Sequence, residues 1–140
     1  SRKTLLNFTR RLVRELNWHT LTGELNIALV RDPQIRKLKK NFYHIDRVTD
    51  VIAFSYSPFE KGKERGAPFA DIFVSIDTAR RQALEGGHTL LHELALLIMH
   101  GMLHIVGYRD HTPKTQTRMF DRQRALFRKL DPTLAPTDFQ

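Results

Sequence analysis

The sequence predicts one α+β domain, a small mixed β-sheet packed with helices. Segments with helical spacing of apolar residues alternate with short β-branched segments along the chain, and 140 residues is close to the size of one domain. Hydrophobic residues are 41% and charged residues 27% of the chain, which is typical of globular proteins and excludes a wholly disordered chain. We therefore expect residues 1–140 to form a single domain with a mobile tail over 131–140.

The first third of the chain predicts helix, strand and helix in turn. Residues 4–18 repeat apolar side chains at the spacing of an amphipathic helix, and residues 25–30 alternate as a strand does. Asp32 and Pro33 indicate a helix start, because aspartate caps helices and proline is tolerated in the first turn. That helix is expected over 32–43.

The middle of the chain predicts two strands and a loop. Residues 49–56 are rich in β-branched and aromatic side chains and favour a strand. Residues 58–68 combine glycines, prolines and charges, which is typical of an exposed loop. A second short strand is expected over 71–76.

The last part of the chain predicts three helices. Ser75 or Asp77 is expected to begin the first of them, and the glycines at 86–87 to end it. Residues 88–106 form the most apolar of the expected helices, so we expect it to be buried on most sides. After a loop, a final helix is expected over 114–130.

The net charge and the absence of cysteine limit the possible functions. The chain has 23 Lys and Arg against 15 Asp and Glu, a net charge of +8 that favours a polyanionic partner such as nucleic acid. It has no cysteine, which excludes a disulfide scaffold, a thiolate zinc site and a cysteine nucleophile. We find no signal peptide, and the longest apolar run, 94–99, is too short for a membrane span. A cytoplasmic protein without a membrane partner is expected.

Three histidines form the strongest candidate for a chemical site. His100 and His104 stand four residues apart on the buried helix, so their rings are separated by about 40° around its axis and about 6 Å along it. His111 follows a turn that Gly107 permits, and the chain can fold back to bring it to the pair. Three imidazoles with an open fourth position are typical of a catalytic zinc site.

Two further patterns are interpreted as non-catalytic. His88 and His92 also stand four residues apart, but no third ligand follows them after a turn, so we interpret this pair as structural or surface residues. A common helical zinc protease carries Glu directly after the first histidine of its pair, and here that position is Gly101. Glu93 lies about 10 Å further up the helix axis, too far to replace that general base.

The residues around the histidines resemble one family. Residues 100–111 read HGMLHIVGYRDH, which is similar to the signature His-Gly-x-Leu-His-Leu-x-Gly-Tyr-Asp-His of the YbeY endoribonucleases. Residues 49–54 resemble the Thr-Asp-Val-Leu-Ser-Phe strand of that family, and residues 70–72 resemble its Gly-Asp-Ile segment. Glu93, followed by leucine, matches the Glu-Leu pair upstream of the signature.

The resemblance implies a small metal-dependent, single-strand-specific endoribonuclease that acts in maturation of small-subunit ribosomal RNA and in ribosome quality control. It implies one zinc ion held by His100, His104 and His111 at the mouth of a basic cleft. Activated water or the RNA 2′-OH then attacks the phosphodiester, and the sequence does not choose between these nucleophiles. The implied partners are ribosomal RNA and the small ribosomal subunit, with a ribosomal protein or a ribosome-assembly GTPase in addition.

The sequence departs from the family in two places. Arg109 is an additional residue between the tyrosine and the Asp-His pair of the signature, and it lengthens the turn. An arginine that the family places before its Thr-Asp-Val strand is replaced here by Tyr43 or His44. The role of that arginine is then either vacant or taken over by His44 or Arg47, which are our candidates for contact with the RNA phosphate. Asp110 either orients a metal-binding imidazole or caps the turn.

Two other functions are compatible with the same residues. The first is a ribosome-associated RNA-binding module whose zinc is structural or degenerate, which the two departures favour. The second is a zinc hydrolase of small substrates, against which the basic charge and Gly101 count. Nickel, cobalt or copper could also occupy imidazole ligands, because the affinity order of divalent metals does not favour zinc alone.

Overall fold

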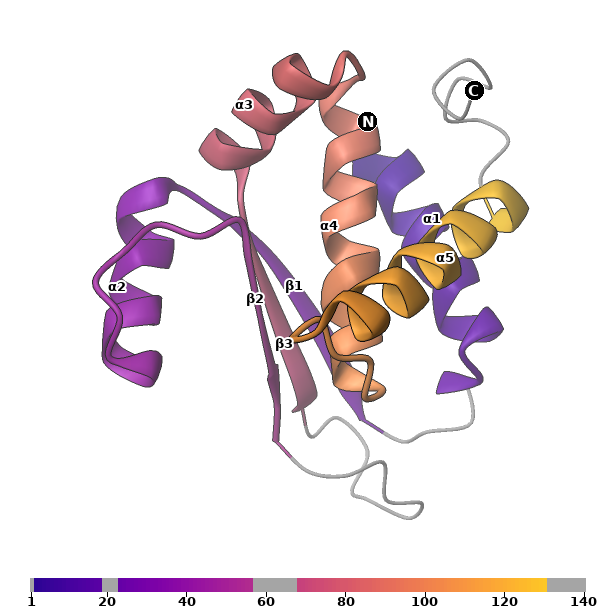
Figure 1. Ribbon diagram of the computed structural model, residues 1–140, viewed down its shortest axis with the longest axis horizontal. Helices are drawn as coiled ribbons and strands as arrows, with labels where there is room; N and C mark the ends of the chain where they lie inside the picture. The colour runs from indigo at the N-terminus through magenta and orange to yellow at the C-terminus, as the bar shows by residue number, and fades with distance from the viewer. Residues whose placement is uncertain (1, 19–22, 57–67, 131–140) are drawn as a thin grey trace.

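The computed structural model describes residues 2–18, 23–56 and 68–130 and arranges them in one α+β fold (Figure 1). The elements in chain order are α1 (Arg2–Glu15), β1 (Glu24–Val30), α2 (Asp32–Tyr43), β2 (Val51–Ser55), β3 (Pro68–Ser75), α3 (Ile76–Gly86), α4 (Leu90–Ile105) and α5 (Pro113–Leu130). This confirms the predicted fold class. The expected tail and all but the last residue of the expected loop 58–68 lie outside the described residues.

The sheet is small and mixed. Its strand order is β1-β3-β2, with β1 parallel and β2 antiparallel to the central strand β3. Ile72 in β3 pairs with Ile27 on one side and with Ala53 on the other. The central strand begins earlier than the sequence predicts, at Pro68, because its first residues extend the pairing with β1 and β2.

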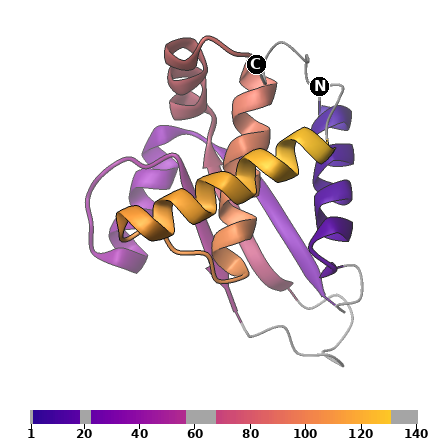
Figure 2. The same ribbon diagram turned by 45° about the vertical axis from the view of Figure 1, so that its right-hand side comes forward.

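The helices form layers on the two faces of the sheet. Figure 1 shows α2 on one face and α4 on the other, while α1 and α5 lie against the outer side of α4. After the turn in Figure 2, α5 crosses in front of α4 at a steep angle. Within the described ranges, no helix has the length and apolar character that a bilayer span requires.

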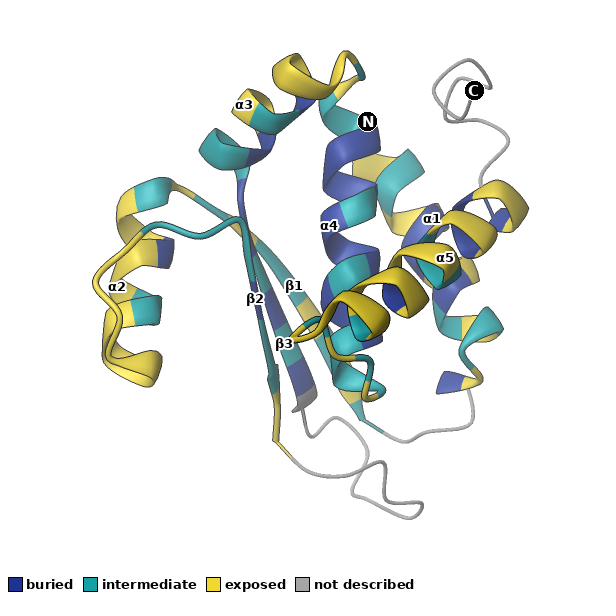
Figure 3. Cartoon of the chain, viewed as in Figure 1, coloured by how far each residue is buried: buried dark blue, intermediate teal, exposed yellow. Residues whose placement is uncertain are grey.

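The prediction that the 88–106 helix is buried is confirmed. Ten of the 16 residues of α4 are buried, and Figure 3 shows buried positions along most of its length. They pack against α1, α5 and the inner face of the sheet in the main hydrophobic core, whose fully buried members include Met99, Met102 and Leu103. The helix that carries the candidate site therefore has more buried residues than any other described helix.

The residues expected to begin and end α3 do so. Ser75 is the N-cap, and its hydroxyl accepts a hydrogen bond from the Thr78 amide at 3.2 Å. Gly87 ends the helix in the left-handed conformation at φ +69°, which glycine adopts without strain. Local capping signals therefore fix both ends of this helix.

The start of α2 differs from the prediction. Arg31, not Asp32, is the N-cap, and the Arg31 amide donates to Gln34 Oε1 at 2.8 Å. The Asp32 carboxylate instead accepts hydrogen bonds from the Ser75 hydroxyl, the Thr78 hydroxyl and the Arg81 guanidinium. The side chain expected to cap its own helix thus connects α2 to the junction of β3 and α3.

Candidate metal centre and the cavity beside it

The last two turns of α4 bring His100 and His104 together. Their Nε2 atoms lie 3.0 Å apart, and each side chain is 30% exposed. The rings meet nearly edge to face, at an interplanar angle of 82°. The pair is therefore convergent and open to solvent on one side, as the four-residue spacing predicts.

The other nitrogen of each ring faces an oxygen. His104 Nδ1 lies 2.9 Å from the backbone carbonyl oxygen of Tyr108, and His100 Nδ1 lies 2.7 Å from Gln123 Oε1 on α5. A backbone carbonyl only accepts hydrogen bonds, so Nδ1 of neutral His104 carries the proton and its Nε2 presents a lone pair. With Gln123 Oε1 as the acceptor, neutral His100 has the same tautomer. Two lone pairs facing each other repel unless a cation lies between them, so the donor set fits a divalent metal ion.

A carboxylate completes the group. Asp110 Oδ2 lies 3.6 Å from His104 Nε2 and 3.8 Å from His100 Nε2. In the part of the chain that the structure describes, His100, His104 and Asp110 are the side chains whose ligand atoms all lie within 4.8 Å of one another. Two imidazoles and one carboxylate are an ordinary ligand set for catalytic zinc.

The turn after α4 explains how Asp110 reaches the pair. Gly107 has φ +111°, a conformation that side chains rarely adopt, and the Tyr108 amide returns to donate to the Leu103 carbonyl at 3.0 Å. The guanidinium of the additional Arg109 donates to the backbone carbonyls of His104 and Tyr108, both at 3.3 Å. A cation at this end of a helix is favourable, so the inserted residue also stabilises the turn.

The remaining predicted residues do not join this group. His111 is exposed and is not among the side chains that converge, so its role as a ligand stays a prediction. His44 ends α2 with φ +59°, and Arg47 follows in the exposed segment before β2. Neither belongs to the metal group or to the cavity described below, and their phosphate contacts also stay predictions.

Burial lowers the pKa of His104, and the neighbouring His100 lowers it further. The hydrogen bond to the Tyr108 carbonyl and the charge of Asp110 act in the opposite direction without cancelling this effect. The neutral imidazole is consequently favoured at neutral pH. Neutral imidazole is the form that binds a metal ion.

The upstream histidines have structural contacts. His88 Nε2 lies 2.6 Å from Glu93 Oε1, and the His88 ring stacks on His92 with centroids 4.3 Å apart. His92 is 5% exposed and also contacts the ring of Phe127 at 4.8 Å. The contact of His92 with Phe127 joins α4 to α5, and all of these contacts agree with a structural interpretation of the pair.

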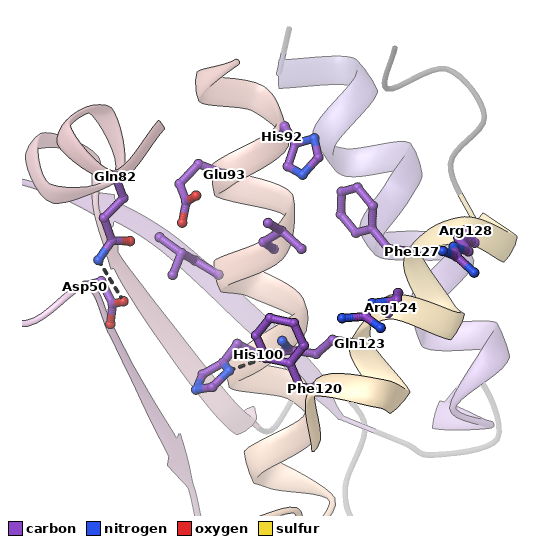
Figure 4. A pocket seen from close by; sticks show the side chains of 12 residues that line it. Asp50, Gln82, His92, Glu93, His100, Phe120, Gln123, Arg124, Phe127 and Arg128 are labelled. Carbon is purple, nitrogen blue, oxygen red and sulfur yellow. Dashed lines mark hydrogen bonds between the residues drawn. The ribbon is translucent and has the colours of Figure 1, made fainter. Parts of the chain in front are cut away.

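Beside the metal group lies a cavity of about 440 Å³ between α4 and α5, which extends toward α3 (Figure 4). His100 belongs to both the cavity and the metal group. Gln123, which the sequence analysis missed, also lies at this boundary, since it orients His100 and lines the cavity. No local signal marks Gln123, because it stands 23 residues from its partner along the chain.

The comparisons with known proteins agree with the geometry. The chain matches the family described as Endoribonuclease YbeY over residues 1–131. It is 39% identical over 105 residues to Endoribonuclease YbeY of Acholeplasma laidlawii, covering 75% of this chain and 73% of that protein. It is 40% identical over 108 residues to the Elusimicrobium minutum protein of the same name, covering 77% of this chain and 75% of the relative.

Other relatives differ in length or are more distant. Endoribonuclease YbeY of Myxococcus xanthus is 40% identical over 96 residues, which are 69% of this chain but 33% of that longer protein. The solution structure of a Thermotoga maritima protein superposes with a TM-score of 0.59 at 26% identity, covering 93% of this chain and 83% of the other. By its match over nearly the whole sequence, this chain belongs to the Endoribonuclease YbeY family.

Proposed function

We propose that this chain is a metal-dependent endoribonuclease that cuts single-stranded segments of small-subunit ribosomal RNA during its maturation and in ribosome quality control. The observation that carries the proposal is the convergence of two imidazole lone pairs and one carboxylate in a chain of an endoribonuclease family. The net charge of +8 supports a polyanionic substrate.

In this proposal His100, His104 and Asp110 hold the ion, and Gln123 and the Tyr108 carbonyl orient the two rings. A divalent ion held by these residues would supply Lewis-acid chemistry at a phosphate oxygen or a water molecule. The mixed nitrogen and oxygen ligands suit zinc first, and nickel, cobalt or copper remain compatible with imidazole ligands. The attacking group is either water or the RNA 2′-OH.

The proposed setting is the cytoplasm, with the small ribosomal subunit and its RNA as the partner. A ribosomal protein or a ribosome-assembly GTPase is proposed as a further partner. The alternative proposal is an RNA-binding module on the ribosome whose metal is structural, and the departure at Arg109 favours it.

One experiment separates the two proposals. Metal content is measured for the purified chain and for His104→Ala. Both proteins are then incubated with a labelled single-stranded fragment of small-subunit ribosomal RNA, and separately with the same fragment annealed into a duplex. We expect about one zinc ion per chain and cleavage of the single strand, both lost in His104→Ala while circular dichroism shows a folded variant. Loss of metal together with unfolding, and no cleavage by either protein, would instead support the RNA-binding module.

A further inference from the structure

The cavity beside the metal group has two chemically different ends. The end toward α3 contains the carboxylates of Asp50 and Glu93, which come from the segment before β2 and from α4 (Figure 4). The other end contains Arg124 and Arg128 on α5. An RNA phosphate is repelled at the carboxylate end and attracted at the arginine end, so the charges would orient a nucleotide that enters.

The surface between these ends is apolar and aromatic. Leu96, Leu97 and Phe127 line it, and Phe120 stands at its opening (Figure 4). Phe120 is a large aromatic side chain, yet it is 60% exposed. The guanidinium carbon of Arg124 lies 5.5 Å from the centroid of the Phe120 ring. Exposed aromatic rings with adjacent arginines are the surfaces on which proteins stack unpaired bases.

The size and position of the cavity also suit a base. A volume of about 440 Å³ is in the range of small-ligand pockets, roughly 300–1,000 Å³. Because His100 is shared with the metal group, an occupant of the cavity lies directly next to the phosphodiester that the metal group would engage.

We propose that this cavity binds one unpaired nucleobase of the RNA, stacked on Phe120, while Arg124 and Arg128 contact the adjoining phosphates. The inference rests on the proposed function and adds a substrate subsite to it. It also gives a physical reason for a single-strand preference, because a base held in a duplex cannot leave its stack to enter the cavity without an energetic cost.

The test uses a short single-stranded oligoribonucleotide and a series in which one base at a time is removed to leave an abasic position. Affinity is measured by fluorescence anisotropy with the metal removed by chelation, and cleavage is measured separately with zinc present. The proteins are the unmodified chain, Phe120→Ala, Phe120→Trp, Arg124→Ala and the control Arg11→Ala, which removes an exposed charge on α1. Since Phe120 is largely exposed, its replacement leaves the core intact.

We expect one abasic position to weaken binding to the unmodified chain and to Phe120→Trp by about tenfold or more. Phe120→Ala should bind the intact and abasic oligonucleotides equally weakly. Arg124→Ala should lower the affinity for the intact and abasic oligonucleotides to a similar extent. It should also reduce the dependence of affinity on salt concentration more than Arg11→Ala does.

The outcomes distinguish this inference from the proposed function. If the unmodified chain cleaves the RNA but Phe120→Ala retains the full abasic effect, the base subsite is wrong and the endoribonuclease proposal stands. A second outcome is that one abasic position weakens binding to the unmodified chain and to Phe120→Trp but not to Phe120→Ala, while no cleavage occurs with zinc. In that case the subsite stands and the proposed catalytic function is wrong.

Discussion

Asp110 Oδ2 lies 3.6 Å from His104 Nε2, and the two residues are six positions apart in the chain. In the family signature the last histidine also follows the second histidine by six positions. Here the inserted Arg109 gives that place to Asp110 and moves His111 one residue further. The turn at Gly107 thus returns Asp110, and not His111, to the pair of imidazoles.

The first prediction compares the two candidates for the third ligand. Asp110→Ala should weaken zinc binding by at least about tenfold, because it removes the carboxylate that faces both Nε2 atoms. His111→Ala should have a smaller effect. Affinity is measured by competition with a chromophoric chelator, with Asp121→Ala as an exposed carboxylate control. The reverse order, with zinc lost only in His111→Ala, would restore the three-histidine site.

The second prediction concerns the amide that orients His100. Gln123→Ala should weaken zinc binding by about 10–100-fold, because the ring then lacks the oxygen that fixes its tautomer and orientation. Gln123→Glu keeps an acceptor oxygen and should retain most of the affinity. The cobalt-substituted protein provides the measurement, through its visible absorption during titration. Equal binding by all three proteins would show that α5 does not orient the site.

The third prediction concerns Gly101, between the two histidines. A Cβ atom there would lie 3.2 Å from Ile72 Cγ2 and 3.4 Å from Val51 Cγ2, so α4 approaches the sheet at this glycine. Gly101→Ala gains helix propensity and should stay within about 1 kcal/mol of the unmodified chain. Gly101→Val adds two further methyl groups beyond the Cβ atom of alanine and should lower the free energy of unfolding by about 2–3 kcal/mol. Urea denaturation measures both, and equal stability of all three proteins would contradict this close packing.

The fourth prediction links Asp32 to acid stability. Burial disfavours its carboxylate, but hydrogen bonds from Ser75, Thr78 and Arg81 outweigh this effect and hold the pKa of Asp32 below its usual 3.8. A lowered pKa means that the contribution to stability is complete above about pH 4 and is lost as the pH falls through the folded-state value. Asp32→Ala should therefore be less stable at neutral pH by about 2 kcal/mol.

As the pH falls through the folded-state pKa of Asp32, the difference in stability between Asp32→Ala and the unmodified chain should shrink. The measurement is urea denaturation across this pH range. Asp46→Ala serves as the control, since Asp46 forms an exposed ion pair with Arg36 on the surface. A stability difference that stays constant down to the lowest pH would show that the charge of Asp32 is not responsible.

The sequence predicts those features that depend on neighbouring residues. Ser75 and Gly87 fix the ends of α3 through local hydrogen bonds and backbone conformation, so their signals are visible without the fold. The pair His100 and His104 is predictable for the same reason, because helix geometry alone places both rings on one face.

Features that depend on distant partners are not predictable in this way. The Asp32 carboxylate accepts hydrogen bonds from residues more than 40 positions away in the chain. The local sequence, in which Asp32 resembles a helix cap, does not reveal these partners. Gln123 reaches His100 only because α5 crosses α4. The choice between Asp110 and His111 depends on the path of a turn, and a turn's path is sensitive to a single inserted residue.

The two parts of the candidate site differ in how they are assembled. All three converging ligands come from residues 100–110, one helix end and its turn, whereas the cavity joins side chains from Asp50 to Arg128. Bringing close neighbours together costs little chain entropy, but closing a long loop costs more and requires the helices to be docked. Partial loosening of the fold should therefore abolish discrimination between substrates before it abolishes affinity for the ion.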